Sequence, residues 1–70
     1  MNDNEKKVEA VLFAVGREIT AERVASLCSL PVWDVQEILK TLQAEYEQRN
    51  HSLRLMQKEN GWKLTVRDEF

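Results

Sequence analysis

The chain has 70 residues, a formal net charge of −2 at pH 7 and 31% charged residues. A chain of this length holds one domain, and its small core buries only about 60% of the surface that the unfolded chain exposes. The charge balance is not that of a basic nucleic-acid-binding protein, so any DNA contact would have to come from a local patch. Cys28 is the single cysteine, which excludes an internal disulfide. The longest apolar run, 10–15, is far shorter than the roughly 20 residues that a membrane span needs.

The first expected element is a helix that begins after Asn2. Asn2 and Glu5 have the spacing of a capping box. The apolar positions that follow recur on one helical face: Val8, Val11, Leu12 and Val15. Gly16 is a typical helix end, because glycine readily adopts the left-handed conformation. Phe13 and Ala10 fall on roughly the opposite side, where they either meet a partner or, slightly favoured, pack beneath a sheet.

A short extended link at 17–19 leads to two further helices joined by a tight turn. Thr20 caps the second helix, whose expected inner face carries Val24, Leu27 and Cys28. Pro31 breaks the pattern and starts a longer third helix that ends near 49–50. Its core stripe comprises Val35, Ile38, Leu39, Leu42 and Tyr46.

From Leu53 onward the apolar period changes to two, which predicts a pair of strands. Asn60 and Gly61 form the strongest short hairpin signal and predict a two-residue turn at 60–61. In that register Leu55 lies opposite Val66, Lys58 opposite Lys63, and Arg54 opposite Arg67. The apolar residues of both strands then share one face. The sequence therefore predicts an α+β winged helix-turn-helix fold in which three helices precede a two-stranded wing hairpin, as a single domain over 1–70.

Three stretches resemble the segregation and condensation protein B family. The segment from Val8 to Thr20, VEAVLFAVGREIT, is similar to the family's opening, which typically reads EAxLFAxGxPLS. The third helix carries L-x-x-L-x-x-x-Y-x-x-R from Leu39 to Arg49, and GWKL at 61–64 resembles the family's wing. The chain departs from the family pattern at Glu18, where proline is common, and at 31–33, where a polar helix cap is usual.

The resemblance implies a non-catalytic accessory subunit of the prokaryotic condensin complex, acting in chromosome condensation and segregation. Such a subunit forms a homodimer, binds a kleisin of the segregation and condensation protein A type and, through it, joins the SMC ATPase. Family members carry two winged-helix domains, so 1–70 corresponds to the amino-terminal one. We expect no cofactor and no membrane contact, and a cytoplasmic, nucleoid-associated location.

No constellation of residues indicates catalysis. His51 is the single histidine and falls in a predicted loop, and Cys28 has no second cysteine near it. Both are best interpreted as structural residues. The two glycines stand apart, without the glycine-rich loop that binds phosphate.

The open question in the sequence is whether the domain binds protein or DNA. The outer face of the hairpin carries Arg54, Lys58, Lys63 and Arg67, which either contact nucleic acid or an acidic partner weakly, or protect the strand edges. The third helix carries Asp34, Glu37, Glu45 and Glu47 against Lys40 alone, which disfavours a place in the major groove. A winged-helix DNA-binding transcription regulator is the alternative function.

The start of the third helix offers a candidate protein contact. Helical spacing places Trp33 on the same side as Glu37 and Lys40, about 160° from the core stripe. With Leu30 and Val32, it forms an apolar patch that is predicted to be exposed. Trp33 either meets the kleisin or the twin subunit, or folds back on the preceding turn.

Overall fold

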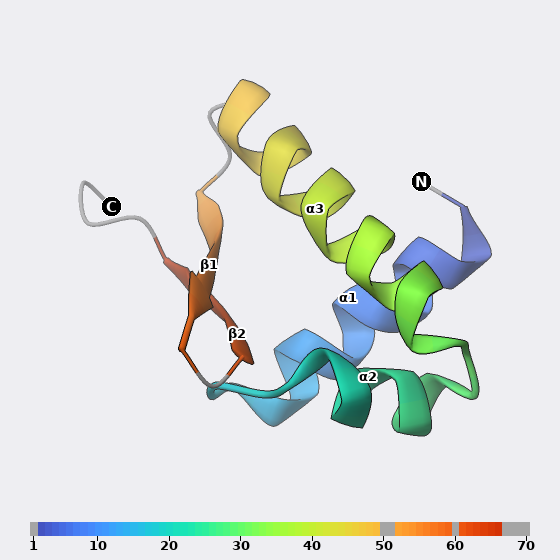
Figure 1. Ribbon diagram of the computed structural model, residues 1–70. Helices are drawn as coiled ribbons and strands as arrows, with labels where there is room; N and C mark the ends of the chain where they lie inside the picture. The colour runs from blue at the N-terminus through green and yellow to red at the C-terminus, as the bar shows by residue number, and fades with distance from the viewer. Residues whose placement is uncertain (1, 50–51, 60, 67–70) are drawn as a thin grey trace.

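The computed structural model describes residues 2–49, 52–59 and 61–66. Helices α1 (Asp3–Val15), α2 (Ala21–Cys28) and α3 (Val32–Gln48) are followed by strands β1 (Leu53–Lys58) and β2 (Gly61–Val66). Figure 1 shows the long α3 passing in front of α1, with α2 below α3 and the hairpin to one side of the helices. The predicted α+β winged-helix architecture is confirmed.

The helix ends follow the predicted local chemistry. At the start of α1, the Glu5 backbone N–H donates to the Asn2 side chain at 2.8 Å, while the Asn2 N–H donates to the Glu5 carboxylate at 3.2 Å. Gly16 closes α1 in the left-handed conformation. The Arg23 backbone N–H donates to the Thr20 hydroxyl at the start of α2. These bonds satisfy backbone donors that helix ends would otherwise leave without partners.

The core lies where the three helices meet the hairpin. The whole predicted α3 stripe is buried, and α1 contributes Val8 and Leu12. The remaining core side chains come from α2, the link and the hairpin: Ile19, Ala21, Val24, Ala25, Cys28, Leu55 and Trp62. Leu27 was expected in this core but is 50% exposed. Ala21 and Ala25 take its place because α2 presents its small side chains to the core.

The hairpin register differs from the predicted one by two residues. Gly61 pairs with Lys58, Leu64 with Leu55, and Val66 with Leu53, so positions 59 and 60 join the strands. Lys58 therefore does not face Lys63, and Arg54 faces Thr65 instead of Arg67. A shift of two residues keeps each side chain on its face, whereas a shift of one would exchange the faces. The prediction that the apolar residues of both strands share one face is therefore confirmed, although the predicted register is wrong.

The cause of the register is a contact between the hairpin and the link after α1. The Ile19 N–H donates to the Trp62 carbonyl at 2.9 Å, and the Trp62 N–H donates to the Ile19 carbonyl at 2.7 Å. A Cβ atom on Gly61 would lie 2.2 Å from the Ile19 carbonyl oxygen, and its φ of 145° suits glycine alone. Gly61 is needed for this close backbone approach and not for the turn.

The other edge of the hairpin is attached to α3. The Gln43 side-chain amide donates to the Leu55 carbonyl oxygen at 3.0 Å. Because Trp62 directs its backbone groups away from β1, the alternation of the ladder places the Leu55 carbonyl on the outer edge of β1. Gln43 thus covers part of an edge that would otherwise be open.

Shortening a buried leucine of the α3 stripe should strongly destabilise this small domain. We expect Leu39→Ala or Leu42→Ala to lower the free energy of unfolding by about 2 to 5 kcal/mol, because both side chains are fully buried. Urea unfolding followed by circular dichroism measures this. Thr41→Ala on the exposed side of α3 is the control and should cost less than about 0.5 kcal/mol. A cost below about 1 kcal/mol at both leucines would contradict the assigned core.

A methyl group at Gly61 should break the link to Ile19. We expect Gly61→Ala to cost about 2 kcal/mol or more, because the new Cβ overlaps backbone that has no room to move. Gly16→Ala is the matched control, since its Cβ would lie no nearer than 4.0 Å to the Phe13 carbonyl oxygen and only the left-handed backbone is penalised, by about 1 kcal/mol. Equal losses for the two variants in urea unfolding would show that the close approach is unimportant.

Candidate partner-binding surfaces

The described residues offer no catalytic centre of the kinds weighed in the sequence. Cys28 is buried, and burial raises the pKa of its thiol although Lys7 lies near enough to oppose the shift. A buried, protonated thiol is a poor nucleophile. No group of three or more metal-ligating side chains gathers within 2–49, 52–59 and 61–66. His51 lies outside the described residues.

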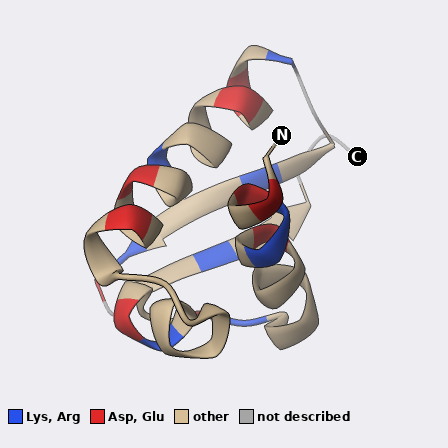
Figure 2. Cartoon of the chain, turned by 90° about the vertical axis from the view of Figure 1, so that its right-hand side faces the viewer, with Lys and Arg blue, Asp and Glu red and all other residues tan. Residues whose placement is uncertain are grey.

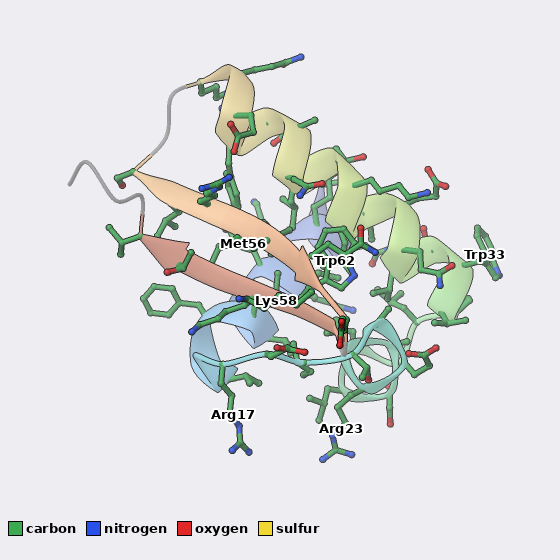
Figure 3. All side chains as sticks on the ribbon, turned by 60° about the vertical axis from the view of Figure 1, so that its left-hand side comes forward. Arg17, Arg23, Trp33, Met56, Lys58 and Trp62 are labelled. Carbon is green, nitrogen blue, oxygen red and sulfur yellow. The ribbon has the colours of Figure 1, made fainter. Side chains whose placement is uncertain are left out.

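The side chains with the most exposed apolar surface stand on two separate parts of the molecule. Trp33 is 67% exposed at the start of α3, and Phe13 is 72% exposed on α1. Figure 3 shows Trp33 projecting away from the body of the domain. Large exposed aromatic side chains that gather with other apolar residues usually mark contact surfaces. We call these two regions the α3 patch and the α1 groove.

The α3 patch comprises Leu30, Val32 and Trp33, with Glu37 and Lys40 on the same side of the helix. Leu30 is half-buried and packs against the core, while the other four residues are exposed. The exposure of Trp33 confirms the prediction from helical spacing and argues against its folding back as a cover. Pro31 begins α3 without a side-chain cap.

The α1 groove lies between α1 and the start of β1. It encloses about 480 Å³ and is lined by Lys6, Glu9, Ala10, Phe13, Ala14 and Leu53. The interpretation in which Phe13 packs beneath the sheet is wrong, because its ring remains largely in solvent. Sequence reasoning missed Ala14 and Leu53. Ala14 could have been found from helical spacing, but Leu53 could not, since only the folded chain brings β1 to α1.

A hydrogen bond fixes one rim of the α1 groove. The Tyr46 hydroxyl on α3 donates to the Glu9 carboxylate on α1 through a short contact. The pKa of Tyr46 is raised well above its ordinary value, first by burial and then by this hydrogen bond to a negative group. The bond ties the two helices together and holds Glu9 in place at the groove.

On the outer face of the hairpin, one basic side chain lies close to a carboxylate of α3. Arg54 lies 3.8 Å from the Glu47 carboxylate of α3, and both side chains are about half exposed. Lys58 and Lys63 stand on the same face, and Arg67 lies outside the described residues. Figure 2 shows acidic residues along α3 and basic residues on the two strands. A phosphate group approaching Arg54 would also meet the Glu47 carboxylate.

The model of the family described as Segregation and condensation complex subunit ScpB matches residues 6–70. The chain belongs to this family. Two curated relatives carry the name Segregation and condensation protein B. The one from Oceanobacillus iheyensis is 35% identical over 72 residues, covering 99% of this chain and 38% of the relative. The one from Desulforamulus reducens is 31% identical over 62 residues, covering 89% of this chain and 34% of the relative. The chain thus spans little more than a third of either relative.

Solved structures of the ScpB family have the same fold. ScpB from Mycobacterium tuberculosis superimposes with a TM-score of 0.90 at 25% identity, over 97% of this chain and 42% of that one. A dimer of the ScpB N-terminal domain complexed with an ScpA peptide gives a TM-score of 0.82 at 20% identity, over 93% of this chain and 76% of that one. None of the helices in the described part of the chain has the length and apolar character that crossing a bilayer requires.

Binding to duplex DNA should be weak and strongly dependent on salt. Lys58 and Lys63 offer few phosphate contacts, and Arg54 on the same face already lies 3.8 Å from the Glu47 carboxylate. In a fluorescence anisotropy titration with random duplex, we expect affinity to fall at least about tenfold between 50 and 200 mM salt. Lys58→Ala should weaken this binding, whereas Lys40→Ala, on α3, should not. Tight, sequence-dependent binding at 150 mM salt would favour a transcription regulator instead.

Proposed function

We propose that this chain is the amino-terminal winged-helix domain of a non-catalytic accessory subunit of the prokaryotic condensin complex. In this role it dimerises and binds the kleisin subunit, of the segregation and condensation protein A type, and joins the SMC ATPase through it. The subunit then acts in chromosome condensation and segregation, in the cytoplasm and at the nucleoid. It needs no cofactor for this role.

The observation that carries the proposal is the family match over 6–70, together with the structural neighbour that holds an ScpA peptide. The surface chemistry supports it independently. The domain exposes apolar side chains on α1 and at the start of α3, whereas the exposed side of α3 is acidic. Protein interfaces bury aromatic anchors, while DNA interfaces need a basic surface.

Within this function, we propose that the α3 patch contacts the kleisin. Trp33 supplies a large apolar ring, and Leu30 and Val32 extend the apolar surface beside it. Glu37 and Lys40 then form a polar rim one and two turns along the helix. An apolar centre with a charged rim is the arrangement that binding hot spots favour.

Removing the Trp33 side chain should weaken kleisin binding without unfolding the domain. We expect Trp33→Ala to reduce the affinity for the matching ScpA segment by about 2 kcal/mol or more in a calorimetric titration, as the loss of a buried aromatic anchor does. Its thermal midpoint should stay within a few degrees, because the ring contributes little to the core. Gln48→Ala, exposed at the far end of α3, is the control. Unchanged affinity, or a large loss of stability, would mean that Trp33 is structural.

A further inference from the structure

Strand β1 pairs with β2 along one edge, and its other edge carries no strand in the described part of the chain. The Trp62 N–H and C=O both bond to Ile19, so they point away from β1. In an antiparallel ladder the residue opposite, Gln57, then also turns its N–H and C=O outward, as does Leu55 two positions earlier. The Gln43 amide occupies the Leu55 carbonyl. The two backbone groups of Gln57 therefore lie along an edge at which another strand can pair.

A hollow lies beside this edge, between β1 and the second half of α3. It encloses about 380 Å³ and is lined by Gln43 and Glu47 of α3 and by residues 54–57 of β1. A chain segment that pairs with Gln57 can therefore place the side chains of its inner face in the hollow. Peptides that add a strand to a sheet gain affinity from main-chain hydrogen bonds and specificity from pockets for alternate side chains. The edge of β1 offers both.

The outer face of β1 determines which segment fits. It carries two exposed cations with a partly buried apolar side chain between them, in the order Arg54, Met56 and Lys58. Lys63 of β2 lies directly opposite Met56 and adds a third positive charge. Figure 3 shows Met56 and Lys58 on the hairpin. Because opposite charges and apolar pairs stabilise neighbouring strands, the matching segment has an apolar side chain between two acidic ones, at alternate positions.

The contact of Arg54 with Glu47 does not prevent this pairing. The two groups are 3.8 Å apart and their side chains are about half exposed. An ion pair of this kind contributes little in water, so an incoming carboxylate can replace it at Arg54.

The same features disfavour two other occupants of the edge. A second copy of β1 would bring its own cations towards Arg54 and Lys58, and like charges on neighbouring strands are unfavourable. A nucleic acid backbone offers phosphate oxygens, which only accept hydrogen bonds, so it would leave the Gln57 carbonyl without a donor. It would also offer Met56 no apolar partner.

We propose that the open edge of β1 binds an extended, acidic peptide segment of a partner protein, which adds a strand beside β1. Acidic side chains of the segment lie opposite Arg54 and Lys58, and an apolar one lies opposite Met56. The residues of this edge belong neither to the α3 patch nor to the α1 groove. The inference therefore goes beyond the kleisin contact proposed for Trp33 and does not depend on it.

Amide NMR of the nitrogen-15-labelled chain tests the proposal with a synthetic peptide, TTETVTETT, whose ends are blocked. We expect the peptide to shift the Leu55 and Gln57 amide resonances. Methylating the backbone nitrogens of the two threonines beside the valine removes the pairing donors without changing the charge, and should weaken binding at least about tenfold. Replacing both glutamates by lysine should weaken it as strongly, because the cations of β1 then repel the peptide.

A charge reversal on the protein locates the acidic contact. Lys58→Glu should raise the dissociation constant of the peptide at least about threefold. Arg23→Glu is the matched control, since it makes the same charge change at an exposed position of α2 outside this edge, and it should leave the constant within about twofold. The remaining amide resonances should keep their positions in both variants, which shows that the fold is intact.

Four results would overturn the proposal. The first is the absence of any shift at Leu55 and Gln57 at millimolar peptide. The second is equal binding of the methylated peptide, which would show that charge attraction acts without strand pairing. The third is a set of shifts confined to 30–40, which would place the peptide on the α3 patch. The fourth is tighter binding of a random DNA duplex at the same edge, which would assign the edge to nucleic acid.

Discussion

Two backbone hydrogen bonds between Ile19 and Trp62 connect the hairpin to the helices, and the rest of the fold depends on them. They are possible because Gly61 has no side chain to separate β2 from the link that contains Ile19. Once they form, the indole of Trp62 and the side chain of Ile19 both enter the core. The same contact sets the pairing of β1 with β2, since it makes Gly61 the first residue of a strand and excludes it from the turn.

The features that the sequence predicts correctly are those decided within a few residues. The capping box of α1 and the buried stripe of α3 depend on spacings along one helix, and both are confirmed. The hairpin register was wrong because Asn-Gly is a strong local signal, whereas the true role of Gly61 depends on Ile19, more than forty positions earlier. Leu27 was misplaced for a similar reason, because the side of a two-turn helix that faces inward is decided by its neighbours.

The same distinction applies to the candidate surfaces. Trp33 could be predicted as exposed because it lies on a long helix with an unambiguous core stripe. Phe13 could not, since its position opposite the stripe of α1 fits a central helix as well as an interface. The sequence also does not reveal that Glu47 of α3 lies beside Arg54 of the outer hairpin face. The acidic pattern of the third helix could be read from the sequence, whereas the contact of Glu47 with Arg54 required the folded chain.

Trp33 lies outside the core, and we propose that it contacts the kleisin. Fluorine NMR of the chain labelled with 5-fluorotryptophan tests this directly, because Trp33 and Trp62 are the only two tryptophans. We expect the exposed Trp33 resonance to shift when the ScpA segment is added and to broaden with a soluble paramagnetic probe, while the buried Trp62 resonance does neither. A Trp33 resonance that stays unchanged while the segment binds would contradict the account.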